Sequence, residues 1–93
     1  MIDISIIWDL ADDPDGNVQH IAEHGITIEE AAEVLRNRRG RTGRSRRSGR
    51  PQVVGWTSTG KYIPVIWEEV SSDPRMIYPV TSHAVALPQG RQR

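Results

Sequence analysis

The sequence predicts one small α+β domain, in which two helices near the N-terminus pack on one face of a small antiparallel β-sheet. A chain of 93 residues supports a single domain. Helix-start signals occur early in the chain, and the second half holds apolar runs joined by short turns. A thin sheet cannot bury both of its faces alone, so the helices are expected to cover one of them. The expected order is β-α-α-β-β-β-β, with the domain spanning residues 1–85 and residues 86–93 forming a flexible tail.

A half-buried strand is expected at the N-terminus. Apolar and polar side chains alternate from Ile2 to Trp8, which is the period of a strand with one face covered. The following stretch ADDPDG ends it. Asp13 and Pro14 then predict the start of the first helix, with an aspartate cap and a proline at the first helical position. Gly25 is placed to end that helix in a left-handed conformation.

The second helix has a clearer start. Thr27 and Glu30 have the spacing of a capping box, and Ile26 and Ala31 that of a hydrophobic staple around it. This helix is expected to end near residues 36–37.

The charges of the chain are segregated, although the formal net charge is zero. Nine of the twelve acidic residues lie between Asp3 and Glu33, and eight of the twelve basic residues, all arginines, lie between Arg36 and Arg50. Residues 38–50 contain no apolar side chain. The composition alone is that of a disordered basic tract. An exposed edge strand or hairpin arm is the alternative, because charge on an edge discourages pairing with other chains.

Three further strands are expected at residues 52–57, 61–70 and 75–82. The turn of residues 58–60 joins the first two as a hairpin, and residues 71–74 form the next turn. Pro64 and Pro79 lie inside the last two runs. Each removes a backbone donor, so bulges or edge positions are expected there.

The arginine segment predicts contact with phosphate groups. Guanidinium groups bind phosphate through a forked, permanently charged donor set. Trp56, Tyr62 and Trp67 follow on the neighbouring strands and could stack on bases. The alternative interpretation is a solvated loop, or a surface neutralised by the acidic groups of a protein partner. The arginines predicted to hold RNA are Arg41, Arg44, Arg46, Arg47 and Arg50.

Lys61, Arg75, Tyr78 and His83 would gather at one end of the sheet if the last two strands pair. Histidine and tyrosine can transfer protons, and a lysine or arginine can stabilise charge on phosphorus. The alternative is that Tyr78 packs in the core and His83 is a solvated strand end.

No metal or cofactor is expected. His20 and His24 share a helix face at a spacing that could hold a metal, but the sequence offers no third ligand. Cysteine is absent, which excludes thiol chemistry and fits a reducing compartment. No apolar run approaches the roughly 20 residues of a membrane span, and the N-terminus is acidic where a secretory signal would be basic. We therefore expect a cytoplasmic protein without a membrane partner.

The sequence resembles BrnT-type toxins, within the RelE/ParE-like toxin superfamily. The segments that carry the resemblance are IIWD, GNVQHIAEHGITIEEAAEVL, GRPQVVGWTSTGKYIPVIWEE and MIYPVTSHAV, which together span roughly residues 4–85. The matching positions are Trp8, Asp9, Asn17, His24, Gly25, Ile26, Glu30, Ala31, Gly55, Gly60 and Lys61.

The resemblance implies the toxin of a type II toxin–antitoxin system. Such a toxin would be a metal-independent endoribonuclease, neutralised by a ribbon-helix-helix antitoxin, that uses the 2′-OH of RNA as nucleophile. Lys61 would then stabilise the transition state, and Tyr78 and His83 would transfer protons. Assembly as a homo-oligomer or as a toxin–antitoxin hetero-oligomer stays open.

The alternative function is a catalytically silent interaction module on the same fold. The final strand of the family carries two arginines at positions where this chain has Tyr78 and His83. In that case the arginine tract would bind an acidic protein partner or DNA.

Overall fold

The computed structural model describes residues 4–37 and 40–85 of the chain. The element order matches the expected one, and the α+β class is confirmed. The elements are β1 (Ser5–Ile6), α1 (Asn17–Glu23), α2 (Ile28–Arg36), β2 (Arg41–Arg44), β3 (Pro51–Trp56), β4 (Tyr62–Ser72) and β5 (Arg75–Ser82). The expected tail of residues 86–93 lies outside the described residues.

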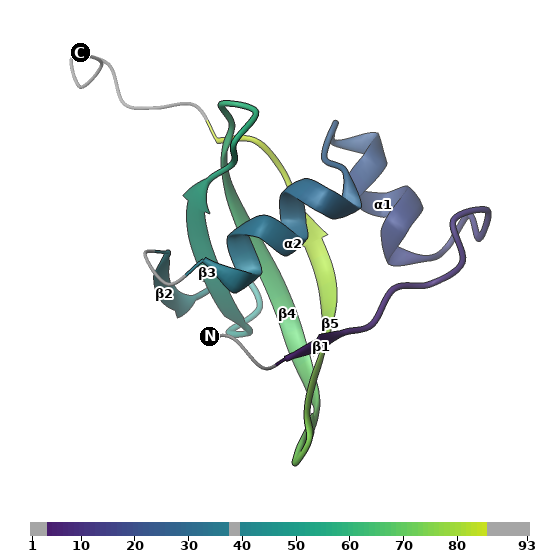
Figure 1. The fold of residues 1–93 in the computed structure, drawn as a ribbon, viewed down its shortest axis with the longest axis vertical. Helices are drawn as coiled ribbons and strands as arrows, with labels where there is room; N and C mark the ends of the chain where they lie inside the picture. The colour runs from purple at the N-terminus through teal and green to yellow at the C-terminus, as the bar shows by residue number, and fades with distance from the viewer. Residues whose placement is uncertain (1–3, 38–39, 86–93) are drawn as a thin grey trace.

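The five strands form one sheet in the order β1-β5-β4-β3-β2. Strands β2 to β5 form the expected antiparallel meander. β1 pairs parallel with β5, so the prediction of a purely antiparallel sheet was wrong at this edge. A parallel pair needs a long connection, and here nearly the whole chain lies between its two strands (Figure 1). β1 ends earlier than predicted, because after Ile7 the chain leaves the edge of β5. Ile2 and Asp3, the first residues of the predicted strand, lie outside the described residues.

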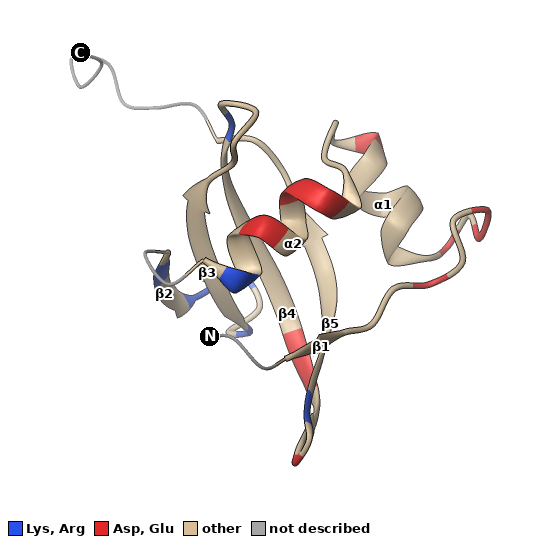
Figure 2. Ribbon diagram, viewed as in Figure 1, with Lys and Arg blue, Asp and Glu red and all other residues tan. Residues whose placement is uncertain are grey.

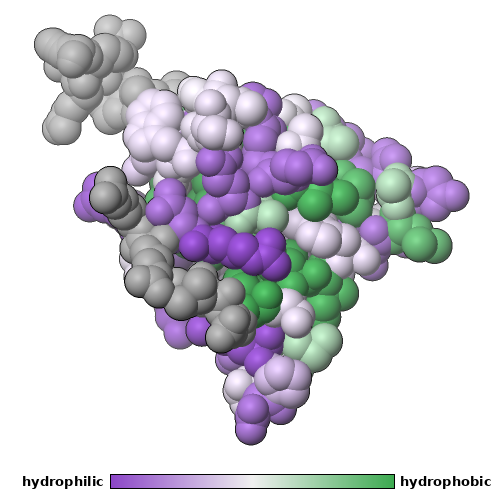
Figure 3. Space-filling model, in the orientation of Figure 1, coloured by the Kyte–Doolittle hydropathy of each residue, from purple (hydrophilic) through white to green (hydrophobic). Residues whose placement is uncertain are grey.

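Both helices lie across the same face of the sheet, as predicted (Figure 1). α1 packs on β5, whereas α2 packs on β3 and β4. Beneath them is the core, whose members are Ile4, Ile21, Ile26, Ala31, Val34, Leu35, Val53, Ile63, Val65, Trp67 and Ile77. Figure 3 shows that hydrophilic side chains cover much of this helical face, while apolar surface emerges beside α2 towards β1.

The two helix starts differ in how they are built. In α2 the capping box is present: the Thr27 hydroxyl accepts from the Glu30 N–H at 3.1 Å, and the Glu30 carboxylate accepts from the Thr27 N–H at 3.0 Å. α1 begins at Asn17 with Gly16 as its cap, so the predicted start at Asp13 and Pro14 was wrong.

The reason is that the cap of α1 comes from a distant part of the chain. The Asp9 carboxylate accepts the Asn17 N–H at 2.8 Å, and Asn17 returns the bond by accepting from the Asp9 N–H at 2.9 Å. The Asp13 carboxylate accepts from the Asp15 N–H, inside the preceding turn. Gly25 follows α1 with φ of 79°, which confirms the predicted left-handed end.

The two strand prolines behave differently. Pro79 lies at a register shift between β4 and β5, as expected. Pro64 shows no register shift, so no bulge forms there, but it lies beyond the last pair of the β4–β5 ladder and so takes the expected edge position. The Pro64 carbonyl accepts from the Ser82 hydroxyl at 2.7 Å. The last pair of the β4–β5 ladder is Val65 with Ser82, so Pro64 lies one residue beyond it. The missing N–H of Pro64 therefore faces a place where no ladder bond is needed.

Candidate nucleic-acid interface

The basic segment forms an edge strand and a turn. We call residues 41–50 the arginine arm. β2 is exposed along its whole length and pairs with β3 on one side, so the edge-strand alternative is confirmed for Arg41–Arg44. Arg38 and Arg39 lie outside the described residues. Figure 2 shows basic residues at this edge, whereas acidic residues lie on the helices, on the loop before α1, on β4 and at the turn between β4 and β5.

The five predicted RNA-binding arginines are not equivalent. Arg44 donates to the Gly49 carbonyl at 3.0 Å, and Arg50 forms an ion pair with Glu68 at 2.7 Å. Within the described residues, the side chains of Arg41, Arg46 and Arg47 have no hydrogen bond or ion pair, and all three are exposed. These three guanidinium groups can therefore bind an external anion without breaking an internal contact.

An aromatic pair lies beside the start of the arm. A Cβ placed on Gly55 would be 3.5 Å from Val34 of α2, so this position of β3 faces the helices. Side chains alternate along a strand, hence Val54 and Trp56 point to the opposite, uncovered face. Trp56 pairs with Tyr62 across the strands, with ring centroids 5.0 Å apart, and its side chain is 49% exposed.

A hollow of about 360 Å³ opens at this place. The last pair of the β2–β3 ladder is Arg41 with Val54, so the edge of β3 beyond it has no strand partner among the described residues. The residues that line the hollow are Asn37, Arg41, Val54, Gly55, Trp56 and Tyr62. Trp67 is only 4% exposed and belongs to the core, so the prediction that it could stack on bases was wrong.

Lys61 holds the helices to the sheet. Its ammonium donates to the Gly25 carbonyl at 2.7 Å, after α1, and to the Glu30 carboxylate of α2 at 3.1 Å. Glu30 is buried, and it also accepts from the Thr59 hydroxyl. Burial raises the pKa of Glu30, but the hydrogen bonds from Thr59, Thr27 and Lys61 and the lysine charge outweigh it and lower the pKa to about 2.

Tyr78 is engaged by Asp9. Its hydroxyl donates to the Asp9 carboxylate at 2.5 Å. This bond, burial, and the negative charges of Asp9, Asp13 and Glu68 raise the pKa of Tyr78 to about 12, while the same bond and the Asn17 N–H lower the pKa of Asp9. A phenol held in this way keeps its proton at neutral pH. It is thus a poor proton-transfer group and a good support for the start of α1.

His83 lies in a row of histidines that the sequence did not reveal. Its ring centroid is 6.1 Å from that of His24, which is 5.4 Å from that of His20. His20 also bonds the Thr81 hydroxyl at 3.0 Å. All three histidines of the chain therefore meet where the end of α1 passes the end of β5.

The spacing of His20 and His24 predicted that these two share a helix face, but the position of His83 beside them was not predictable, because it is nearly sixty residues from His24 and only the packing of α1 on β5 joins them. Within the described residues, no three histidine, cysteine, aspartate or glutamate side chains are placed to hold a metal ion. Arg75 pairs instead with Glu69 at 3.5 Å, near the β4–β5 turn. The expected gathering of Lys61, Arg75, Tyr78 and His83 at one end of the sheet thus does not form as a single group.

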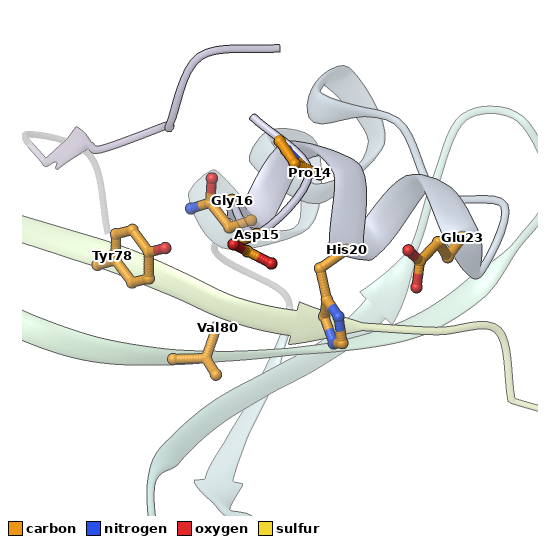
Figure 4. Close-up of a pocket in the computed structure, with 8 residues that line it drawn as sticks. Pro14, Asp15, Gly16, His20, Glu23, Tyr78 and Val80 are labelled. Atoms are coloured by element: carbon orange, nitrogen blue, oxygen red, sulfur yellow. The ribbon is translucent and has the colours of Figure 1, made fainter. Parts of the chain in front are cut away.

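A second hollow, of about 390 Å³, lies between α1 and β5 (Figure 4). Its lining carries the carboxylates of Asp15 and Glu23 and no lysine or arginine, so it does not favour a phosphate group. The full lining is Pro14, Asp15, Gly16, Asn17, His20, Glu23, Tyr78 and Val80. Of the two hollows, only the one beside the arginine arm has the charge and the exposed aromatic ring that suit nucleic acid.

Comparison of the chain with protein-family models, with curated proteins and with solved structures finds no match. None of the helices in the described part of the chain is long and apolar enough to cross a membrane.

Proposed function

We propose that this protein is an RNA-directed toxin of the RelE/BrnT type, neutralised by a ribbon-helix-helix antitoxin. Support comes from the sequence resemblance and from the element order, with both helices on one face of the sheet. The observation that carries the proposal is the arginine arm: three free guanidinium groups on an exposed edge, next to the exposed ring of Trp56. Basic groups that track a backbone, combined with a stacking ring, are typical of single-stranded nucleic-acid binding.

The proposed reaction is cleavage of RNA by its own 2′-OH, without a metal. Imidazole is the side chain that most often acts as general acid or base, and the exposed rings of His24 and His83 lie side by side, with centroids 6.1 Å apart. One imidazole takes the proton of the 2′-OH as that oxygen attacks phosphorus. The bond from phosphorus to O5′ breaks, and the other imidazolium gives a proton to O5′. The products are a 2′,3′-cyclic phosphate and a 5′-OH end.

This assignment changes the roles of two predicted site residues. Lys61 and Tyr78 are engaged by Glu30 and Asp9, and we assign them to holding the fold. His83 keeps its predicted role in proton transfer, and His24 joins it in a role that the sequence did not predict for this residue.

The test is primer-extension mapping of RNA ends after induction of the protein in cells. We expect new 5′ ends and growth arrest for the unaltered chain, and a loss of cleavage of about 10²- to 10⁴-fold for His24→Ala or His83→Ala. The matched control is His20→Ala, because the His20 ring is bonded to Thr81. Equal cleavage by all three variants would refute the histidine assignment, and unchanged RNA with the soluble, unaltered chain would refute the toxin.

A second candidate is a catalytically silent interaction module on the same fold. It is favoured by the engagement of Lys61 and Tyr78 in internal contacts. The arginine arm would then dock an acidic protein or DNA, and RNA would stay intact in the mapping experiment. A shallow dependence of binding on salt would favour a protein partner, because only a phosphate backbone releases many counterions.

A further inference from the structure

The hollow beside the arginine arm is unusual in carrying a large ring that the fold does not bury. Trp56 is 49% exposed, whereas Trp67 on the neighbouring strand is 4% exposed. Indole and phenol rings dominate the recognition of flat ligands, because they give large contact area with few rotatable bonds. We propose that this hollow is a slot for one unpaired nucleobase, so that the protein selects single-stranded RNA. The inference rests on the proposed action on RNA and adds the form of RNA that is recognised.

The ring arrangement fits a stacking platform. Tyr62 lies opposite Trp56 in the β3–β4 register, with the two ring planes at 51°. Tyr62 therefore supports the indole from the adjacent strand and limits the positions it can take. Every base has an aromatic face, so such a platform accepts bases with little regard to sequence.

The volume of the hollow and the charge of Arg41 in its lining are suited to one nucleotide. At about 360 Å³ it is near the lower end of the range for small-ligand sites, roughly 300–1,000 Å³. Arg41 lines it and is exposed, so its guanidinium can hold the phosphate attached to a base that stacks on Trp56. From Arg41 the arm continues to Arg46 and Arg47, which offers a path for the phosphates that follow.

Selection of single strands follows from this geometry. In a duplex the faces of the bases are covered by their neighbours in the stack, so a protein ring can stack only on an unpaired or extruded base. The arginine arm, in contrast, contacts phosphates that both forms of RNA present. The slot should therefore add affinity for single strands alone.

The experiment measures binding of two oligonucleotides, a single-stranded RNA and its duplex, to the full chain and to Trp56→Ala, Trp56→Phe and Leu10→Ala. We expect Trp56→Ala to weaken single-strand binding by about 5- to 100-fold and to leave duplex binding unchanged. Trp56→Phe should restore most of the loss, because phenylalanine still offers a ring. Leu10→Ala removes an exposed apolar side chain far from the slot in sequence and serves as the control, with no effect expected.

Two outcomes separate this inference from the proposed function. In the first outcome, Trp56→Ala binds single strands like the unaltered chain, while the double variant with Arg46→Gln and Arg47→Gln binds them more weakly. The arm then binds RNA, and the base slot is refuted. If the unaltered chain binds neither RNA, the slot and the proposed function are both refuted. Protection of tryptophan fluorescence from iodide by the single strand, but not by the duplex, would support the slot if it is lost in Trp56→Phe, which keeps the buried Trp67 and the half-buried Trp8.

Discussion

Single residues show why a chemically plausible group need not be a catalytic one. Lys61 has the charge that a phosphoryl transfer would use, but its ammonium already donates to the carbonyl of Gly25 and to the carboxylate of Glu30. Glu30 in turn serves the capping box of α2. The sequence predicted the capping box, because its spacing is local. It could not predict that Lys61 would complete the same cluster, since thirty-one residues separate Lys61 from Glu30.

The buried Glu30 predicts a stability loss in acid. Its pKa in the folded protein is lowered to about 2, below its ordinary value of 4.5, so folding favours the ionised form. The stabilisation is fully present above about pH 4.5 and is lost as the pH falls from there towards 2, by roughly 3 kcal/mol at most. Urea unfolding followed by circular dichroism between pH 6 and pH 2 measures it.

The control for this titration is Glu30→Gln, which keeps the shape of the side chain and has no proton to gain. We expect this variant to be less stable at pH 6 and to lose less stability between pH 4.5 and 2 than the unaltered chain. The same acid dependence in both proteins would contradict the assignment of that loss to Glu30.

Among the elements, residues close together in the sequence determine where α2 and the β2–β5 meander form. The start of α1 is determined by a contact between residues that are distant in the sequence. The helix α2 begins and ends where its capping box and its arginine end predict. The start of α1 depends on Asp9, which reaches across the loop to the N–H of Asn17, and no spacing rule links those two residues. The bulge at Pro79 was predictable from the chemistry of proline. For Pro64 the sequence did not decide between a bulge and an edge position, because the outcome depends on where β5 ends.

The approach of Asp9 to the start of α1 leaves no room for a side chain at Gly16. A Cβ at Gly16 would lie 2.6 Å from the Cβ of Asp9, so an alanine there must push Asp9 away from α1. We expect Gly16→Ala to lower the free energy of unfolding by about 1–3 kcal/mol, measured by urea unfolding. The matched control is Gly43→Ala on the open edge strand β2, where nothing lies within 4 Å. That change should stay within about 0.5 kcal/mol, and equal losses at the two glycines would contradict the packing argument.

For the whole molecule, the sheet order explains both the successes and the failures of sequence reasoning. A meander follows from short turns, so β2 to β5 were predictable. The parallel pairing of β1 with β5 joins the two ends of the domain, and nothing local indicates it. The same closure brings α1 against β5, and so assembles the histidine row from segments far apart in the chain.

Acidic and basic side chains also lie in different parts of the molecule. The acidic hollow lies between α1 and β5, and the arginine arm lies at the opposite edge, beyond β3. Our central proposal is therefore that a phosphate backbone binds at the edge of the sheet that carries the arginine arm. The segregation of charge was visible in the sequence, whereas the placement of the exposed aromatic pair beside the arm was not.

The most direct test of this claim is the salt dependence of single-stranded RNA binding by the full chain and by a variant with Arg41→Gln, Arg46→Gln and Arg47→Gln. Each phosphate contact on a single strand contributes about 0.7 to the slope of log K against log salt, so the variant should lose a slope of about 2. Arg75→Gln is the control, because Arg75 is outside the arm and already pairs with Glu69, and its slope should match that of the unaltered chain. A steep slope that survives the triple substitution would place the RNA elsewhere and contradict the account.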